Sequence, residues 1–436
     1  MRCRLAATIE IDCFKLHTLH STLHTVYSSF SNACRLGFYI PMGSRREKAS
    51  EAGWSHFAEH MVLQGSEKYP SSKIVNRIMD RFGGITNAAT SRLWTKFYAH
   101  VPAYGVKTAI DVLGDAIAHP LFLEQEIEKE RKVILEEIKM DEDDSVNRFL
   151  RAACVGLWPL HPLSKLVTGT PKSIAPINAK SLKEFHRSRY TSRGAMFLAT
   201  GKVDHDEIVE RVRPVFDALT HTPEPRYRPA SPDWPISPMV VERCGESQAR
   251  FIISFRGVKG ADPRRHAQQL LSTILGGDSS SRLFRSVRER HGLAYSVGAY
   301  SSSYEDHGEF SVSGGVSADS LEKTLSLCGR ELKELIRKPV GRQELSSRRE
   351  KFASLYVLTS EGDCESEYDV LDMCLKVFKK IVPPEEEVAR IRSISAPELQ
   401  SLAAEIFRPE NCSLALSLPR GCKASPEKLR EALLNG

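Results

Sequence analysis

The chain has 436 residues, 41% of them hydrophobic, so it is long enough to bury more than one core, and two domains are expected. The net charge of +6 is small for this length, and basic residues are interspersed with acidic ones, which argues against a nucleic-acid-binding surface. No apolar run is long enough for a helix that spans a bilayer, so no membrane partner is expected.

The cysteines and the N-terminal segment indicate a compartment. Ten cysteines are scattered without a C-x-x-C pair, which favours free thiols in a reducing environment over a disulfide framework. The N-terminal segment reaches Glu10 and Asp12 before any sufficient apolar stretch, unlike a secretory signal or an acid-free transit peptide. We therefore expect a cytoplasmic protein.

The first informative helix is predicted within residues 53–65, where His56, Glu59 and His60 form the pattern H-x-x-E-H. Residues four apart share one face of a helix, so both imidazoles can bind one ion. Glu59 follows His56 by three residues, which keeps its carboxylate close to whatever that ion holds. The pattern reverses the common H-E-x-x-H zinc motif and is known in hydrolases, so it predicts a zinc peptidase.

A later helix, which includes residues 127–138, is predicted to supply the third ligand. Catalytic zinc usually takes three protein ligands and leaves a fourth position for water. The apolar stripe of this helix consists of Ile127, Ile134 and Ile138. Glu130 and Glu137 border that stripe, whereas Glu136 is rotated about 100° away, where water is expected. Glu137 is therefore the predicted ligand, and Glu130 is predicted to support the ligands by hydrogen bonding.

A proline-rich stretch divides the chain. Six prolines lie within residues 222–238, and because proline fixes φ and removes a donor, this stretch is predicted to be a semi-rigid linker. It separates an N-terminal domain, residues 1–221, which holds the zinc site, from a related C-terminal domain, residues 239–436.

The two halves show a faint internal repeat. In the first, a helix containing residues 77–81 is followed by Gly83-Gly84 and a strand from Ile85; in the second, a helix containing residues 285–290 is followed by Gly292 and a strand from Leu293. Such glycines suit the end of a helix that turns into a strand. The predicted class is α+β, with two related domains that each pack helices on a mostly antiparallel sheet.

With these motifs, the chain resembles the pitrilysin and insulinase family of zinc metallopeptidases, which includes the mitochondrial processing peptidases, in a short two-domain form. That family combines H-x-x-E-H with a distant glutamate in a run like E-R-x-V-I-L-x-E, here Glu130 to Glu137. The resemblance implies that His56, His60 and Glu137 bind one Zn²⁺ per chain and that Glu59 is the general base. It extends from about Gly37 into the C-terminal region.

Two further segments match the family and imply substrate contacts. The run Gly83 to Ser91 resembles a family strand whose edge pairs with an extended peptide, which assigns substrate binding to Asn87 and Ala88. Arg288 and Tyr295 have the family spacing of a pair that holds substrate and helps to stabilise the oxyanion. Leu93 departs from the family, which often has an acidic residue there.

The resemblance implies an endopeptidase for short or unfolded peptides, and a homodimer in which the arginine–tyrosine pair reaches the zinc of the partner chain. A heterodimer stays open. So does a non-catalytic or substrate-binding subunit of a processing peptidase, because some relatives act in this way with decayed metal motifs. A third possibility is a maturation peptidase that trims one dedicated precursor.

Overall fold

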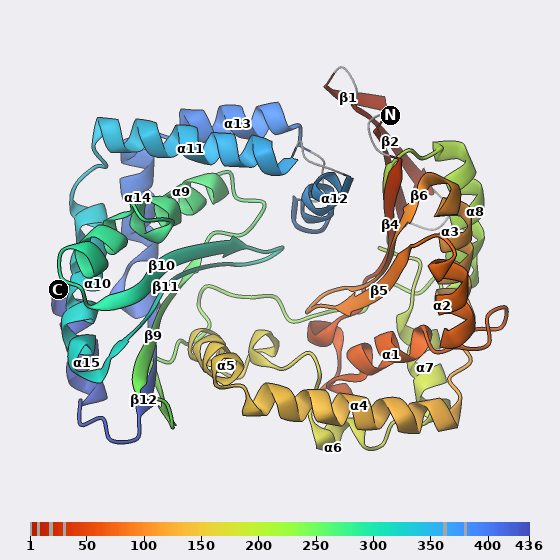
Figure 1. The fold of residues 1–436 in the computed structure, drawn as a ribbon, viewed down its shortest axis with the longest axis horizontal. Coiled ribbons are helices and arrows are strands. Elements are labelled where there is room, and N and C mark those ends of the chain that lie inside the picture. Colours follow the sequence, from red (N-terminus) through yellow and green to blue (C-terminus); the bar gives the residue numbers. More distant parts are fainter. Residues whose placement is uncertain (1, 7–8, 17–20, 29–31, 361–363, 379–381) are drawn as a thin grey trace. The chain divides into compact units, whose positions relative to one another are not determined.

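The computed structural model describes all residues except 1, 7–8, 17–20, 29–31, 361–363 and 379–381. The chain forms two compact units (Figure 1). Unit 1 comprises Met1–Asp141, Lys165–Arg228 and Ser360–Asp372, and unit 2 comprises Glu142–Ser164, Pro229–Thr359 and Met373–Gly436. Met1 lies outside the described residues. It is the first residue of the N-terminal segment on which the expectation about targeting rests.

The strands form one sheet in each unit. Those of unit 1 are β1 (Arg2–Ala6), β2 (Ile9–Leu16), β3 (Ser21–Ser28), β4 (Ala33–Ile40), β5 (Ile85–Thr90), β6 (Thr95–Pro102) and β7 (Met196–Gly201). Those of unit 2 are β8 (Met239–Cys244), β9 (Gln248–Gly257), β10 (Ala294–Ser303), β11 (Gly308–Ser317) and β12 (Cys412–Pro419).

Helices surround both sheets. The α-helices that belong wholly or mainly to unit 1 are α1 (Trp54–Val62), α2 (Ser72–Asp80), α3 (Val106–Ala118), α4 (Glu124–Asp143), α6 (Pro171–Ile174), α7 (Ala179–Arg189), α8 (His205–Ala218) and α12 (Cys364–Met373). Those of unit 2 are α5 (Ser145–Leu157), α9 (Arg265–Gly276), α10 (Leu321–Arg337), α11 (Arg342–Ser360), α13 (Pro384–Ser393), α14 (Ala396–Ile406) and α15 (Pro426–Asn435). Two π-helical segments, Phe284–Glu289 and Cys374–Phe378, also lie in unit 2.

The two sheets share one topology. The seven-stranded sheet contains the order β5-β6-β4-β7-β3, and the five-stranded sheet has the equivalent order β10-β11-β9-β12-β8. In both, the last pair is parallel and the other pairs are antiparallel. In unit 1, β2 and β1 extend the sheet beyond β3. The prediction of two related α+β domains with mostly antiparallel sheets is confirmed.

The glycine steps of the predicted repeat have the expected conformation. Gly83, between α2 and β5, has φ of +60°, and Gly292, between the first π-helical segment and β10, has φ of +61°. An L-residue with a side chain is strained in this left-handed region, so glycine ends the helical segment at both places. Both steps lead into the edge strand of their sheet.

The core of unit 1 lies between the sheet and its helices. Successive residues of β4 point to opposite faces, and Leu36, Phe38 and Ile40 join the main core with α1, α3, α4 and α8. The other face of β4, with Tyr39, is buried as well, because α12 covers it. In Figure 1, α12 lies on the opposite side of β4 and β6 from α3 and α8.

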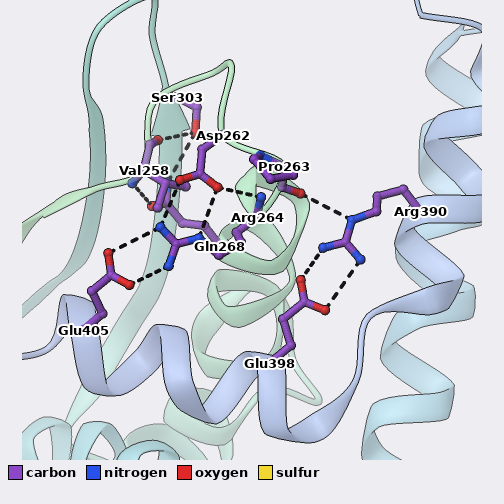
Figure 2. A network of polar contacts seen from close by, with 9 residues as sticks. All are labelled: Val258, Asp262, Pro263, Arg264, Gln268, Ser303, Arg390, Glu398 and Glu405. Carbon is purple, nitrogen blue, oxygen red and sulfur yellow. Dashed lines mark hydrogen bonds and ion pairs between the residues drawn. The ribbon is translucent and has the colours of Figure 1, made fainter.

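The helices of unit 2 are joined by a polar network at the start of α9 (Figure 2). Arg264 binds Asp262 through two nitrogens at 2.9 and 3.1 Å and also reaches Glu405 of α14. Arg390 of α13 donates to the Pro263 carbonyl at 3.3 Å and pairs with Glu398 of α14. The short turn before α9 is therefore held by side chains from two helices more than 100 residues later in the sequence.

The predicted linker has neither helix nor strand over residues 222–238. Arg256 of β9 organises it: its guanidinium donates to the carbonyls of Pro232 and Pro235, at 3.1 and 2.9 Å, and stacks 4.1 Å from the Trp158 ring. Burial lowers the pKa of Arg256 to about 10, so the side chain stays charged at neutral pH.

The predicted boundaries at residues 221 and 238 stay a prediction, but the packing shows two exchanges that they omit. Residues 142–164, early in the chain, belong to unit 2, and residues 360–372, late in the chain, belong to unit 1. Among the helices that the structure describes, none combines the length and apolar composition needed to cross a bilayer.

A buried histidine predicts how unit 1 responds to acid. The His186 ring lies between Phe122 and Tyr190, with centroids 5.6 and 4.3 Å away, and its Nε2 donates to the Ile117 carbonyl at 2.8 Å. Burial lowers the pKa of His186 from 6.5 to about 4. Between these two pH values the imidazole is protonated in the unfolded chain and neutral in the folded chain. The free energy of unfolding should therefore fall by about 2 kcal/mol between pH 7.5 and 5 from this residue alone.

Urea unfolding at several pH values checks this expectation. His186→Gln keeps a donor for the carbonyl but cannot titrate, so its unfolding free energy should fall less steeply below pH 6.5 than that of the wild type. His24, whose pKa burial also lowers to about 4, should leave part of the slope in place. An unchanged slope in the variant would contradict the assignment.

Candidate metal centre

Helix α1 is fixed at its N-terminus by a carboxylate outside the helix. Glu47 accepts hydrogen bonds from the backbone N–H groups of Gly53 and Ser55, at 3.0 and 2.8 Å. Gly53 has φ of +85°, and a Cβ there would lie 2.5 Å from the Thr168 carbonyl oxygen, so no larger residue fits. Burial raises the pKa of Glu47 to about 7 against the opposing effect of these N–H groups. The direction of the motif helix is therefore set by contacts that do not involve the motif.

The two histidines of α1 and one glutamate of α4 converge. Ligand atoms of His56, His60 and Glu137 all lie within 4.8 Å of one another. The two Nε2 atoms are 3.7 and 3.8 Å from different carboxylate oxygens of Glu137. The three isoleucines of the predicted stripe of α4 are buried, as expected, while the Glu136 side chain is 73% exposed.

A second glutamate of α4 orients one imidazole. Glu130 Oε2 lies 3.0 Å from His60 Nδ1, and its other oxygen accepts a hydrogen bond of 2.8 Å from the Gln64 amide. A carboxylate can only accept, so Nδ1 of His60 carries the proton and Nε2 presents its lone pair toward Glu137. This is the arrangement that fixes metal-binding histidines in other proteins.

This donor set fits zinc. Ligands at about 2.0–2.2 Å from a tetrahedral ion lie about 3.3–3.6 Å apart, close to the two nitrogen–oxygen distances measured here. Burial lowers the pKa of His56 to about 4, so the imidazole is neutral at pH 7 and its lone pair is available. Two imidazoles and one carboxylate leave one position of a tetrahedral ion for water or substrate.

Glu59 lies on the same helix as the histidines and is 8% exposed. Burial raises the pKa of its carboxyl above the usual range, and contacts with Thr90 and His60 oppose this shift. A raised pKa brings a carboxylate closer to the proton affinity that a general base needs at neutral pH. Burial also raises the pKa of Glu137, with His60 acting against it.

The predicted substrate strand is the edge of its sheet. β5 is the last strand in the described order and pairs with β6, so among the described residues its other backbone edge has no strand partner. Asn87 is exposed, and its side-chain oxygen accepts from the N–H of Ala88 at 2.8 Å. Ala88 points the other way and packs against the main core, so only its backbone can meet a peptide.

Arg288 and Tyr295 lie together in unit 2, on two uncommon backbone features. Arg288 belongs to the π-helical segment Phe284–Glu289 and Tyr295 is the extra residue of a β-bulge in β10. The guanidinium lies 4.8 Å from the Phe284 ring and 5.1 Å from the Tyr295 ring. The Tyr295 side chain is 82% exposed. π-Helical segments and bulges are frequent at functional sites because they re-aim side chains.

Sequence reasoning missed three residues around this centre. Glu47 has no local capping pattern that would reveal its role, and Gln64 looks like any polar residue after a helix. Tyr190 is fully enclosed, its hydroxyl has no hydrogen-bond partner within the described part of the chain, and the charge of Glu59 adds to the effect of burial in raising its pKa. The run from Glu130 to Glu137, which resembles the family, was the signal that related α4 to α1.

In unit 2 the helix equivalent to α1 lacks a metal motif. By its position before the equivalent edge strand, α9 corresponds to α1, and it contains a single histidine, His266. That histidine is buried and paired with Glu387 of α13 rather than facing a second imidazole. The two units share a strand order, and the described cluster of candidate metal ligands lies in unit 1.

Comparisons with known proteins match two family descriptions to successive parts of the chain. Residues 23–167 match the family described as insulinase (peptidase family M16), and residues 176–352 match the family described as peptidase M16 inactive domain. Two solved structures share the fold, each with a TM-score of 0.82. A protease from Helicobacter pylori is 18% identical, over 94% of this chain and 99% of that chain. A peptidase M16 inactive domain from Pseudomonas fluorescens is 16% identical, over 95% and 100%.

Two similar sequences are named as zinc proteases. An uncharacterized zinc protease of Bacillus subtilis is 31% identical over 397 residues, covering 88% of this chain and 93% of the relative. An uncharacterized zinc protease of Rickettsia bellii is 30% identical over 387 residues, covering 88% and 92%. With this extent of similarity and the convergence of two histidines and a glutamate, the chain belongs to the insulinase family of peptidases, peptidase family M16.

Proposed function

We propose that the protein is a zinc-dependent endopeptidase that hydrolyses short or unfolded peptides. The observation that carries the proposal is the convergence of His56, His60 and Glu137 beside the buried carboxylate of Glu59. The names of the Bacillus subtilis and Rickettsia bellii relatives, both zinc proteases, support the same class of activity. A scaffold subunit does not require a metal donor set or a hydrogen-bonded support such as Glu130, so these residues favour an enzyme.

Each residue of the centre has a chemical role in this proposal. Zinc held by the two imidazoles and the Glu137 carboxylate would supply Lewis acidity, which acidifies water and polarises a carbonyl group. Glu59 accepts the proton of the attacking water and delivers it to the leaving amine. Glu130 holds His60 in the tautomer that leaves Nε2 free.

Substrate binding in the proposal uses the open edge of β5. Backbone groups of an extended peptide pair with that edge, which gives affinity without demanding particular side chains, and Asn87 adds an amide contact. Arg288 and Tyr295 donate to the negative charge that develops on the carbonyl oxygen. We propose, by resemblance, that they act from the second chain of a dimer. Light scattering of the purified protein can check that it is a dimer.

Replacing the proposed base should separate chemistry from metal binding. Glu59→Gln keeps the size of the side chain but removes its proton affinity, so peptide cleavage should fall at least 100-fold while zinc content stays at one ion per chain. Metal analysis and cleavage of a quenched-fluorescent peptide panel provide the two measurements, with Glu136→Gln on the exposed side of α4 as the control. Retained cleavage by a zinc-loaded variant would exclude Glu59 as the base.

The support of His60 can be tested by metal affinity alone. Glu130→Gln replaces the charged acceptor of the His60 Nδ1–H with a neutral amide. Zinc should therefore bind 10- to 100-fold more weakly in a chelator competition. Gln64→Leu, which removes the other partner of Glu130, should shift the affinity in the same direction by a smaller factor. If both variants bind zinc as tightly as the wild type, the hydrogen bonds seen here do not support the metal.

The paired residues of unit 2 have their own test. Tyr295→Phe keeps the ring beside Arg288 but removes the hydroxyl, so kcat/KM should fall by about 10- to 1,000-fold if that hydroxyl stabilises the oxyanion. Tyr300→Phe, in the same strand and also exposed, is the matched control. Equal activity of the two variants would argue that Tyr295 does not meet the substrate.

A further inference from the structure

The sheet face that bears Asn87 continues across two more strands. Opposed residues on neighbouring strands point to the same face, and Asn87 pairs with Tyr98 of β6, which pairs in turn with Gly37 of β4. The next row on this face runs from Ala89 through Lys96 to Tyr39. The face is therefore continuous from the open edge, where the proposed peptide pairs, to the middle of the sheet.

Helix α12 docks on the inner part of this face through Tyr368. The Tyr368 side chain is fully buried, its hydroxyl accepts a hydrogen bond of 2.7 Å from the Tyr39 hydroxyl, and the two rings stack at 6.4 Å. Gly37 provides the space: a Cβ on it would lie 2.3 Å from the Tyr368 hydroxyl oxygen. A side chain at position 37 and a hydroxyl at position 368 cannot coexist in this arrangement.

Charges complete the contact. Three tyrosine rings surround the Lys96 ammonium, with centroids 4.8 to 5.8 Å away: Tyr39, Tyr98 and Tyr368. Lys96 also pairs with Asp372 of α12 at 3.8 Å, and its side chain is only 17% exposed. The attraction between a cation and an aromatic face is strongest where water is excluded, so Lys96 stabilises the docked position of the helix.

The same helix is held from β4. The Arg35 guanidinium lies 5.1 Å from the Tyr368 ring and 5.5 Å from the Tyr98 ring, and it pairs with Asp369 at 3.9 Å. Tyr98 thus contacts Arg35 and Lys96, the two cations that also bind α12. On the neighbouring strand β5, Tyr98 pairs with Asn87. The residues flanking α12 in the sequence belong to unit 2, so the helix reaches this face as a separate segment.

We propose that α12 is a positioning element for the substrate: by fixing Tyr98 and Lys96 of β6, it holds β5 in the geometry that pairs with an extended peptide. The inference rests on the proposed function, because it takes β5 as the peptide-binding strand. It assigns positioning roles to Gly37, Lys96 and Tyr368, all on the face opposite the main core and on elements other than α1 and α4. Loss of the docked helix weakens peptide binding without removing the metal centre.

A clash and its relief test the proposal. Gly37→Ala forces the Tyr368 hydroxyl away, so KM for an unfolded peptide should rise at least tenfold while kcat and zinc content change less than threefold. The double variant Gly37→Ala/Tyr368→Phe removes the clashing oxygen and should restore KM to within threefold of the wild type. Gly245→Ala, where an added Cβ meets nothing within 4 Å, is the control.

Hydrogen exchange gives a readout that needs no activity. In Gly37→Ala, amide protection should fall in residues 364–373 and in 85–90 together, and should return in the double variant. Protection of α12 that survives Gly37→Ala would overturn the docking geometry. Loss of that protection with unchanged KM and unchanged exchange in β5 would overturn the positioning role. A wild-type protein that cleaves no peptide would instead contradict the proposed function, while the exchange result still decides the docking.

Discussion

The burial of one side of α4 determines where the candidate metal ligands lie. The two glutamates that approach α1 project from α4 next to its buried isoleucine stripe. Each isoleucine of that stripe is at most 1% exposed, and burying such a side chain contributes about 1.5–3 kcal/mol. Exposed ion pairs on the same helix, such as Lys129 with Glu126, contribute about 0–1 kcal/mol. Apolar packing therefore sets the rotation of α4, and with it the direction in which Glu130 and Glu137 point.

The same scaffold carries two different groups of polar side chains. Both units order their five common strands identically and end in an edge strand that follows a left-handed glycine. Unit 1 has two ligand-type histidines on α1, the second helix before that strand, whereas unit 2 uses a π-helical segment and a bulge to present Arg288 and Tyr295. Fold alone would not distinguish the two units, because the difference lies in a few side chains and in two local irregularities of the backbone.

Much of the centre could be predicted because its geometry is local or periodic. The four-residue spacing of His56 and His60 dictates a shared helix face, and the isoleucine stripe separates Glu137 from its exposed neighbour Glu136. The irregular proline-rich stretch also follows from a short sequence signal, whereas the edge position of β5 was expected from the resemblance of Gly83 to Ser91 to a family strand. For the shared helix face and the proline-rich stretch, a few neighbouring residues contain the whole physical argument.

The parts that could not be predicted depend on contacts between distant segments. Glu47 caps α1 because the chain before the helix brings it back, and α12 packs on the sheet of unit 1 where Gly37 leaves room for Tyr368. The bulge at Tyr295 shifts a register that sequence alone does not specify. Polar and small residues of this kind have no periodic pattern, so their partners emerge only from the assembled fold.

The extra strands at the start of the chain have a consequence for the sheet of unit 1. In unit 2 the strand order ends at β8, but in unit 1 the equivalent strand, β3, is already paired with β2, and β2 with β1. The main-chain groups of β3 are thus engaged on both sides. A further polypeptide strand therefore cannot add beside β3, and in the described strand order the strands that pair on one side only are β1 and β5.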